Sequence, residues 1–98
     1  MFGMNFGQIR EFEWDENKRA SNLERHGIDF FDVRGVFDGD TLVERSDRLN
    51  EERYAIFGIL EGEVIVAVGT IRGNRCRWLS ARRASRDERE KYHSRVQI

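Results

Sequence analysis

Arginine dominates the last third of the chain and is the residue type best suited to chemistry on phosphate. Residues 71–98 hold nine basic and three acidic side chains, a net charge of +6, whereas residues 1–70 carry −7 within a total of −1. A guanidinium binds phosphate oxygens through two parallel hydrogen bonds and stacks on nucleobases. The uneven charge therefore indicates a local phosphate-binding surface, although the total alone argues against a nucleic-acid partner.

Arg72, Arg77 and Arg82 have no acidic residue within three sequence positions. We predict that they are catalytic and that they meet at one edge of a sheet, where they bind an RNA phosphate and its transition state. Cleavage of RNA without a metal depends mostly on such charge stabilisation and positioning. Arg86 and Arg89 alternate with acidic residues at helical spacing, so local ion pairs explain them.

Several residues are candidates for proton transfer, and the sequence does not single out one of them. His26 is of the type that titrates near neutral pH, but its place at a helix C-terminus is also explained by the helix dipole. Glu52 is a possible catalytic base, or an ordinary exposed strand residue. RNA-binding roles are expected for five further residues: Arg53, Arg75, Arg83, Trp78 and Tyr92. Trp78 lies in the basic strand and suits base stacking, whereas packing is an equal explanation for Tyr92.

Several classes of site are missing from the sequence. Cys76 is the only cysteine, which excludes an internal disulfide and is typical of a small buried strand residue. There is no metal-ligand spacing and no glycine-rich phosphate loop, so we expect neither a metal nor another cofactor. Residues 1–10 lack the apolar core of a signal peptide, and no apolar run approaches the length of a membrane span. We therefore expect a cytoplasmic protein with no membrane partner.

The hydrophobic pattern predicts a single α+β domain with helices before and after an antiparallel sheet. The expected elements are a strand over 8–14, helices over 15–26 and 29–37, strands over 41–46, 53–60, 64–71 and 75–81, and a helix over 85–93. Asp15 and Ser85 are predicted N-caps, and Gly27 a helix end. Ala20 and Leu23 are expected to face inward from the first helix.

Groups of residues along the chain also occur in a characteristic order and spacing. They include Phe12-Glu13-Trp14-Asp15, His26-Gly27, Val36-Phe37-Asp38, Glu52-Arg53, Thr70 with Arg72-Gly73, and Ser80-Ala81-Arg82-Arg83-Ala84. As a set they resemble the BrnT family, from about Phe12 to His93. The resemblance implies a RelE-like fold with an N-terminal strand, two helices, an antiparallel β-meander and a C-terminal helix. It also implies an endoribonuclease toxin that cleaves RNA without metal and arrests growth. Where the family has a bulky or aromatic side chain this chain has Gly69, which would weaken the toxin if that side chain positions RNA.

The resemblance further implies partners. A BrnA-like antitoxin with a ribbon-helix-helix region would neutralise the toxin in a hetero-oligomer, which would bind operator DNA only through the antitoxin and repress its own promoter. We assign residues 12–98 to one toxin domain and residues 1–11 to an N-terminal extension that need not be native. One alternative stays open: a non-catalytic binding module or co-repressor whose basic surface receives an antitoxin or nucleic acid.

Overall fold

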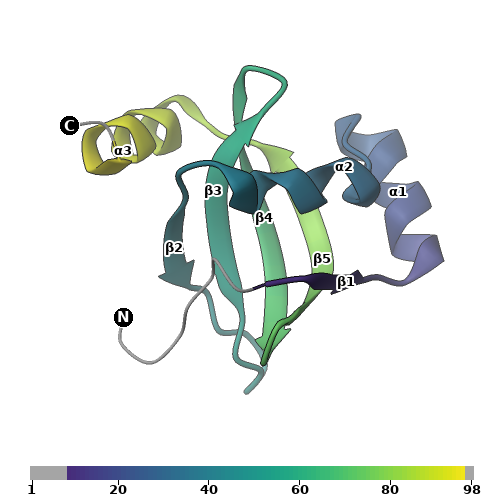
Figure 1. Ribbon diagram of the computed structural model, residues 1–98. Helices are drawn as coiled ribbons and strands as arrows, with labels where there is room; N and C mark the ends of the chain where they lie inside the picture. Colours follow the sequence, from purple (N-terminus) through teal and green to yellow (C-terminus); the bar gives the residue numbers. More distant parts are fainter. Residues whose placement is uncertain (1–8, 97–98) are drawn as a thin grey trace.

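The computed structural model describes residues 9–96, which form one five-stranded sheet flanked by helices (Figure 1). The elements in chain order are β1 (Glu11–Glu13), α1 (Glu16–His26), α2 (Phe30–Val33), the 3₁₀ helix η2 (Arg34–Asp38), β2 (Leu42–Arg45), β3 (Tyr54–Leu60), β4 (Glu63–Arg72), β5 (Arg75–Arg83) and α3 (Arg86–Val96). The strand order is β1-β5-β4-β3-β2, with β1 parallel to β5 and the other pairs antiparallel. The predicted α+β order and the β-meander are confirmed. Gln8, the first residue of the predicted N-terminal strand, lies outside the described residues.

Side-chain caps define where the first two helices begin. The carboxylate of Asp15 accepts hydrogen bonds from the backbone N–H groups of Asn17 and Lys18, and Asp29 accepts one from Phe31. Gly27 ends α1 with φ of 70°, a left-handed conformation that glycine adopts without steric cost. The predicted starts of both helices are confirmed, but the second is α-helical only to Val33 and continues as η2.

An asparagine, rather than an apolar stripe, ties α1 to the sheet. Asn22 is only 6% exposed; its amide nitrogen donates to the carbonyls of Ile28 and Ala81, and its oxygen accepts from the N–H of Ala81. Because β1 pairs with β5 only as far as Arg77, the edge of β5 beyond it needs another polar partner. The expectation that Ala20 and Leu23 face inward is wrong, since both are exposed.

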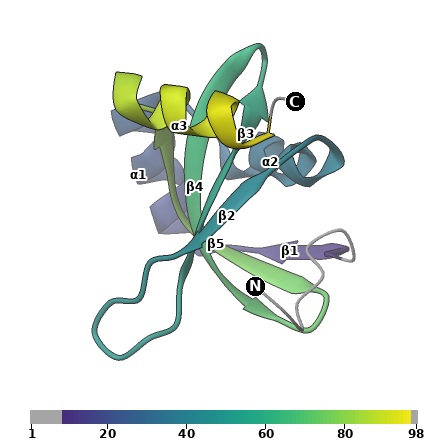
Figure 2. The same cartoon turned by 90° about the vertical axis from the view of Figure 1, so that its left-hand side faces the viewer.

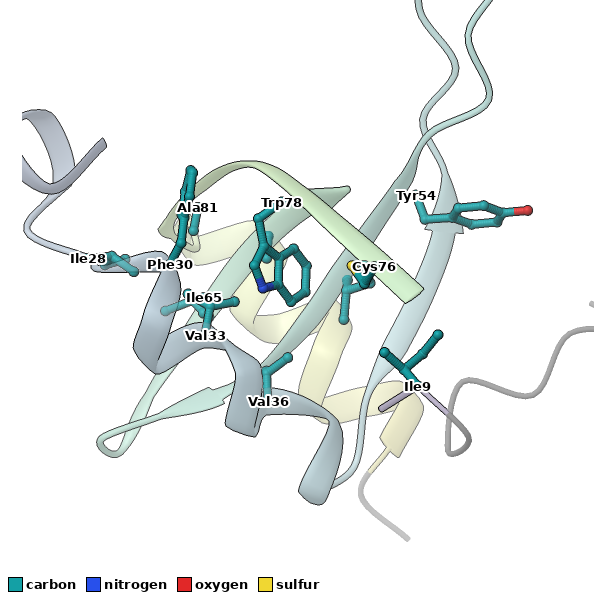
Figure 3. Packing of buried hydrophobic residues seen from close by; sticks show 12 residues of the cluster. Ile9, Ile28, Phe30, Val33, Val36, Tyr54, Ile65, Cys76, Trp78 and Ala81 are labelled. Carbon is teal, nitrogen blue, oxygen red and sulfur yellow. The ribbon is translucent and has the colours of Figure 1, made fainter. Parts of the chain in front are cut away.

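The sheet buries one apolar cluster on each face. The larger cluster lies against α2 and η2 and has Trp78 at its centre (Figure 3). The Trp78 ring stacks on Phe12 and Phe37 with ring centroids 6.0 and 5.8 Å apart. The smaller cluster lies beneath α3 and comprises Phe57, Val64, Val66, Ala84 and Tyr92. It covers only one end of its face, because α3 does not extend over the other end (Figure 2).

A β-bulge interrupts the pairing of β4 with β5. Gly69 pairs with Trp78, whereas Val68 pairs with Ser80, so Leu79 is passed over. Side chains alternate along a strand, but an extra residue reverses the alternation. Positions on both sides of the bulge therefore share the face of Val66, Val68 and Thr70: Arg77, Ser80 and Arg82.

Glycine at position 69 has a packing reason. A Cβ there would lie 2.9 Å from the carbonyl oxygen of Arg77 and 3.2 Å from Cε3 of Trp78. A side chain at position 69 would therefore point into the larger cluster and collide with the ring of Trp78, which glycine leaves room for. A side chain at 69 would face away from Arg77, so the expected loss of an RNA-positioning group at this position has no support in the geometry.

The last residues of the proposed N-terminal extension pack with the domain. Ile9 is 5% exposed in the larger cluster, and the backbone N–H groups of Arg10 and Glu11 both donate to the carbonyl of Asn74. Residues 1–8 of that extension lie outside the described residues. Within residues 9–96, no helix is both long and apolar enough to span a membrane.

Candidate active site

Three arginines converge on the open end of the sheet face that α3 leaves uncovered. They border a hollow of about 340 Å³, which we name the arginine hollow and which is lined by Glu13, Glu51, Thr70, Arg72, Arg75 and Arg77. The grouping follows from strand register. Arg72 pairs with Arg75 and Thr70 with Arg77 across the β4–β5 hairpin, so all four side chains share one face.

The parallel pairing of β1 brings carboxylates to the same face. Glu11 lies beside Arg75, and Glu13 beside Arg77. Arg75 Nη2 contacts Glu11 at 2.6 Å, and Glu13 accepts from Nη1 of Arg75 at 3.3 Å and from Nη1 of Arg77 at 2.8 Å. The hydrogen bonds that Arg75 donates to the carboxylate of Glu11 raise the pKa of Arg75 above its ordinary value. The two carboxylates therefore hold the guanidiniums of Arg75 and Arg77 at the hollow. A phosphate that binds there must either share these guanidiniums with the carboxylates or displace the carboxylates.

Arg72 differs from its two neighbours, because no described carboxylate pairs with it. Its donors are available to a ligand without the loss of an existing ion pair. On the other side of the hollow, Glu51 accepts a hydrogen bond from Nε of Arg53 at 2.7 Å. Arg53 thus adds a fourth guanidinium next to the hollow, held by a carboxylate that lines it.

Arg82 lies at the far end of the same face, so the predicted meeting of Arg72, Arg77 and Arg82 at one edge is wrong. The partners of Arg75 and Arg82 on β4, Arg72 and Val66, are six positions apart, or roughly 20 Å at about 3.3 Å per residue. Arg82 binds Glu88 through two hydrogen bonds of 2.7 and 2.9 Å, which join the end of β5 to α3.

Comparison with known proteins identifies the family of this chain. A family model described as the ribonuclease toxin, BrnT, of type II toxin-antitoxin systems matches residues 14–88. The chain belongs to the BrnT family. The matched region contains every residue of the arginine hollow except Glu13, which precedes it by one position. No curated protein matches the chain.

The other predicted catalytic residues of this BrnT-family chain lie away from the hollow. Glu52 accepts a hydrogen bond of 2.7 Å from the hydroxyl of Tyr54 and pairs with Arg45 at 3.4 Å. That hydrogen bond raises the pKa of Tyr54. The hydroxyl of Tyr54 points away from Trp78 in Figure 3, on the core side of the sheet rather than on the arginine face. Glu52 therefore belongs to a different surface.

His26 and Arg83 contact each other and do not line the arginine hollow. Arg83 Nη1 donates to the backbone carbonyl of His26 at 3.0 Å, and Arg83 also pairs with Glu63 at 3.0 Å. The bulge places Arg83 on the face of Ile65 and Ala81, opposite Arg77. The donated hydrogen bond satisfies a carbonyl at the end of α1, a structural role for Arg83.

Two predicted RNA-binding aromatic residues are buried. Trp78 has no exposed surface, so the prediction that it stacks on bases is wrong. Tyr92 is 4% exposed, and its hydroxyl donates to the carbonyl of Asp40 at 2.7 Å, which fits the packing explanation. Of the helix arginines, Arg86 pairs with Glu90 as expected, whereas Arg89 donates to the carbonyl of Ala84 rather than to an acid.

Sequence reasoning missed the two carboxylates that β1 brings to Arg75 and Arg77. Glu11 and Glu13 alternate with Phe12, a pattern that places both on one face of a strand. Nothing local in the sequence indicated that this strand would pair with β5 in parallel. Within residues 9–96, no group of three or more His, Cys, Asp or Glu side chains is arranged to hold a metal ion.

Proposed function

We propose that this BrnT-family chain is a metal-independent endoribonuclease that cleaves RNA at the arginine hollow. The observation that carries the proposal is the convergence of Arg72, Arg75 and Arg77 on one open face beside the carboxylates of Glu13 and Glu51. Guanidiniums stabilise the negative charge that develops on a phosphate oxygen in the transition state, and do so best when they are fixed in advance. The ion pairs with Glu13 provide that fixation for Arg75 and Arg77.

The proposed reaction is attack by the ribose 2′-oxygen on the adjacent phosphorus. The bond from O2′ to phosphorus forms, the bond from phosphorus to O5′ breaks, and a 2′,3′-cyclic phosphate remains on the upstream product. Arg72 and Arg77 bind the non-bridging oxygens, while Arg53 and Arg75 bind neighbouring phosphates. Glu51 takes the 2′ proton, because one guanidinium holds it whereas two hold Glu13. Water gives a proton to the leaving O5′.

The charges around these carboxylates support the proposal of metal independence. A divalent cation in the hollow would lie beside Arg72, Arg75 and Arg77 and would be repelled by each of them. It would also have to take Glu13 from two guanidiniums. We assign Arg82 to the attachment of α3 and give no catalytic role to His26 or Glu52.

The test is cleavage of a labelled RNA oligonucleotide by purified protein in EDTA. We expect products that end in a cyclic phosphate, no cleavage when a 2′-deoxy residue replaces the ribose at the cut site, and a loss of about 10²-fold in rate for Arg72→Ala or Arg77→Ala. Arg86→Ala, which removes one guanidinium from α3, is the matched control and should keep full activity. Activity that needs an added divalent ion, or that survives both substitutions in folded protein, refutes the proposal.

We also propose that a BrnA-like ribbon-helix-helix antitoxin neutralises this toxin in the cytoplasm by covering the arginine face with an acidic segment. Glu11 and Glu13 already occupy Arg75 and Arg77 from within the chain, so carboxylates of a partner fit the same guanidiniums. Operator DNA would be bound only through the antitoxin. The non-catalytic alternative uses the same face, and expression distinguishes the two: an endoribonuclease arrests growth and Arg77→Ala relieves it, whereas a pure binding module is tolerated.

A further inference from the structure

A second cationic pocket lies beside the arginine hollow, where β5 passes beyond β1 and meets α1. This pocket, of about 300 Å³, is lined by Lys18, Ser21, Arg25 and His26 of α1 and by Ser80 of β5, among others; we name it the α1 pocket. Lys18, Ser21 and Arg25 lie at i, i+3 and i+7, so a single face of the helix presents all three. Their alignment follows directly from helix geometry.

The charge of the α1 pocket is not balanced by any carboxylate among the described residues. No acidic residue lines it, and neither Lys18 nor Arg25 forms an ion pair with any described residue. On the same helix, by contrast, Arg19 is paired with both Glu16 and Asp29. The positive charge of the pocket therefore attracts an external anion without the loss of an internal pair.

The uncharged groups in the pocket suit the same ligand. The hydroxyls of Ser21 and Ser80 can each donate one hydrogen bond. Asn22, although it lines the pocket, uses its amide on Ile28 and Ala81. An ammonium, a guanidinium and hydroxyl donors together favour a phosphate, which accepts hydrogen bonds through several oxygens.

The α1 pocket also adjoins the arginine hollow along one strand. Ser80 shares the face of Arg77 because of the bulge at Leu79, and three residues of strand span roughly 10 Å at about 3.3 Å per residue. In Figure 2, α1 lies on the same side of the strands as α3, whereas α2 and β1 lie on the other side. A strand of RNA in the hollow can thus continue along β5 into the α1 pocket.

We propose that the α1 pocket binds a phosphate of the RNA substrate a few nucleotides away from the cleaved one, through Lys18 and Arg25. This inference rests on the proposed function for the identity of the ligand. It extends the binding surface of the toxin from the sheet to α1. The pocket then contributes to affinity for longer RNA and not to the chemical step.

The test measures binding of uncleavable 2′-O-methyl oligonucleotides, a trinucleotide and a decanucleotide, by fluorescence anisotropy. Lys18→Ala/Arg25→Ala should weaken binding of the decanucleotide about 10-fold and leave the trinucleotide unaffected, since only the longer chain reaches the pocket. The slope of log K against log salt should fall by about 0.7 for the lost phosphate contact. Arg86→Ala/Arg95→Ala, which removes two charges from α3, is the matched control. Thermal unfolding checks that each variant is folded.

Two outcomes overturn the inference. Unchanged affinity of the double variant for the decanucleotide means that the pocket does not bind RNA. An equal loss for both lengths, or the same loss in the α3 control, means that the effect is general electrostatics or damage to the hollow. The binding assay does not depend on cleavage, so the two proposals fail in different ways. If only the proposed function is wrong, wild-type protein will still bind the decanucleotide more tightly than the trinucleotide but will not cut an all-ribose decanucleotide.

Discussion

Replacing Glu88 by glutamine tests whether Arg82 is a structural residue. Glu88 accepts two hydrogen bonds from Arg82 and one from the backbone N–H of Ser85, and its own N–H donates to the Ser85 hydroxyl. The last two contacts form the predicted capping box at the start of α3. Glutamine keeps the length and one acceptor oxygen but loses the charge. The substitution therefore isolates the ion pair that joins β5 to α3.

The hydrogen bonds from Arg82, more than any other contact, lower the pKa of Glu88 from 4.5 to about 2. Taken alone, this pKa difference corresponds to about 3 kcal/mol, since each pKa unit is worth about 1.4 kcal/mol. The side chain of Glu88 is 24% exposed but that of Arg82 is 46% exposed, so solvent screens part of the interaction. We expect Glu88→Gln to cost about 1–2 kcal/mol at pH 7, and to lower Tm by about 4–8 °C for each kcal/mol.

The ion pair between Glu88 and Arg82 also makes the stability of the protein depend on pH in a definite direction. A carboxyl whose pKa is lower in the folded than in the unfolded state stabilises the fold above its unfolded pKa, and the stabilisation disappears as the pH falls through the folded value. Urea unfolding should therefore show a constant difference between wild type and Glu88→Gln above pH 4.5, which shrinks between there and about pH 2. Glu90→Gln, whose partner Arg86 is 83% exposed, is the control and should change little. If Glu88→Gln costs no more than this control at pH 7, or if the difference grows in acid, the structural role of Arg82 is refuted.

Three further substitutions or reactions probe the scaffold. Leu49 has φ of 53° in a two-residue hairpin turn and is 85% exposed, so Leu49→Gly should raise the free energy of unfolding in urea by about 1 kcal/mol; a decrease would contradict the strain argument. Asn22→Ala leaves the edge of β5 at Ala81 unpaired and should cost about 3 kcal/mol in the same assay. Burial raises the pKa of the Cys76 thiol to about 12, so iodoacetamide at pH 8 should modify it only after unfolding; rapid alkylation of native protein would show that β5 opens.

Local sequence signals were sufficient for the elements of this fold. At each of the helix starts, Asp15, Asp29 and Ser85, the side chain accepts a hydrogen bond from a backbone N–H two or three residues later. Such local contacts can be predicted from the sequence. The inner face of α1 could not be predicted in this way. Asn22 faces inward because it completes the edge of β5, and that edge exists only once β1 has ended.

The carboxylate of Glu13 could not be placed from sequence because its partners are distant along the chain. Glu13 meets Arg77 across 64 residues, through a parallel pairing between β1 and β5. Sequence spacing gives Arg72, Arg77 and Arg82 no acidic neighbour within three positions. Among residues 9–96 no carboxylate pairs with Arg72, but Arg77 pairs with Glu13 and Arg82 with Glu88. Neutralisation of a charge is thus a tertiary property, and local sequence spacing alone does not report it.

The bulge at Leu79 decides which arginines of β5 share a face. Counting by twos along β5 puts Arg77 and Arg83 on one face and Arg82 on the other. The extra residue reverses this count, so that Arg82 shares the face of Arg77 while Arg83 turns toward His26. Arg75 and Arg77 lie before the bulge and share one face by simple alternation. The same reversal brings Ser80 onto the arginine face, and with it the α1 pocket into line with the arginine hollow. Deleting Leu79 would remove the extra residue and leave these faces unchanged, because Ser80 would then follow Trp78 directly and alternate with it. Long RNA should therefore keep its binding advantage over short RNA in the deletion variant, and loss of that advantage in folded protein would contradict the role given to the bulge.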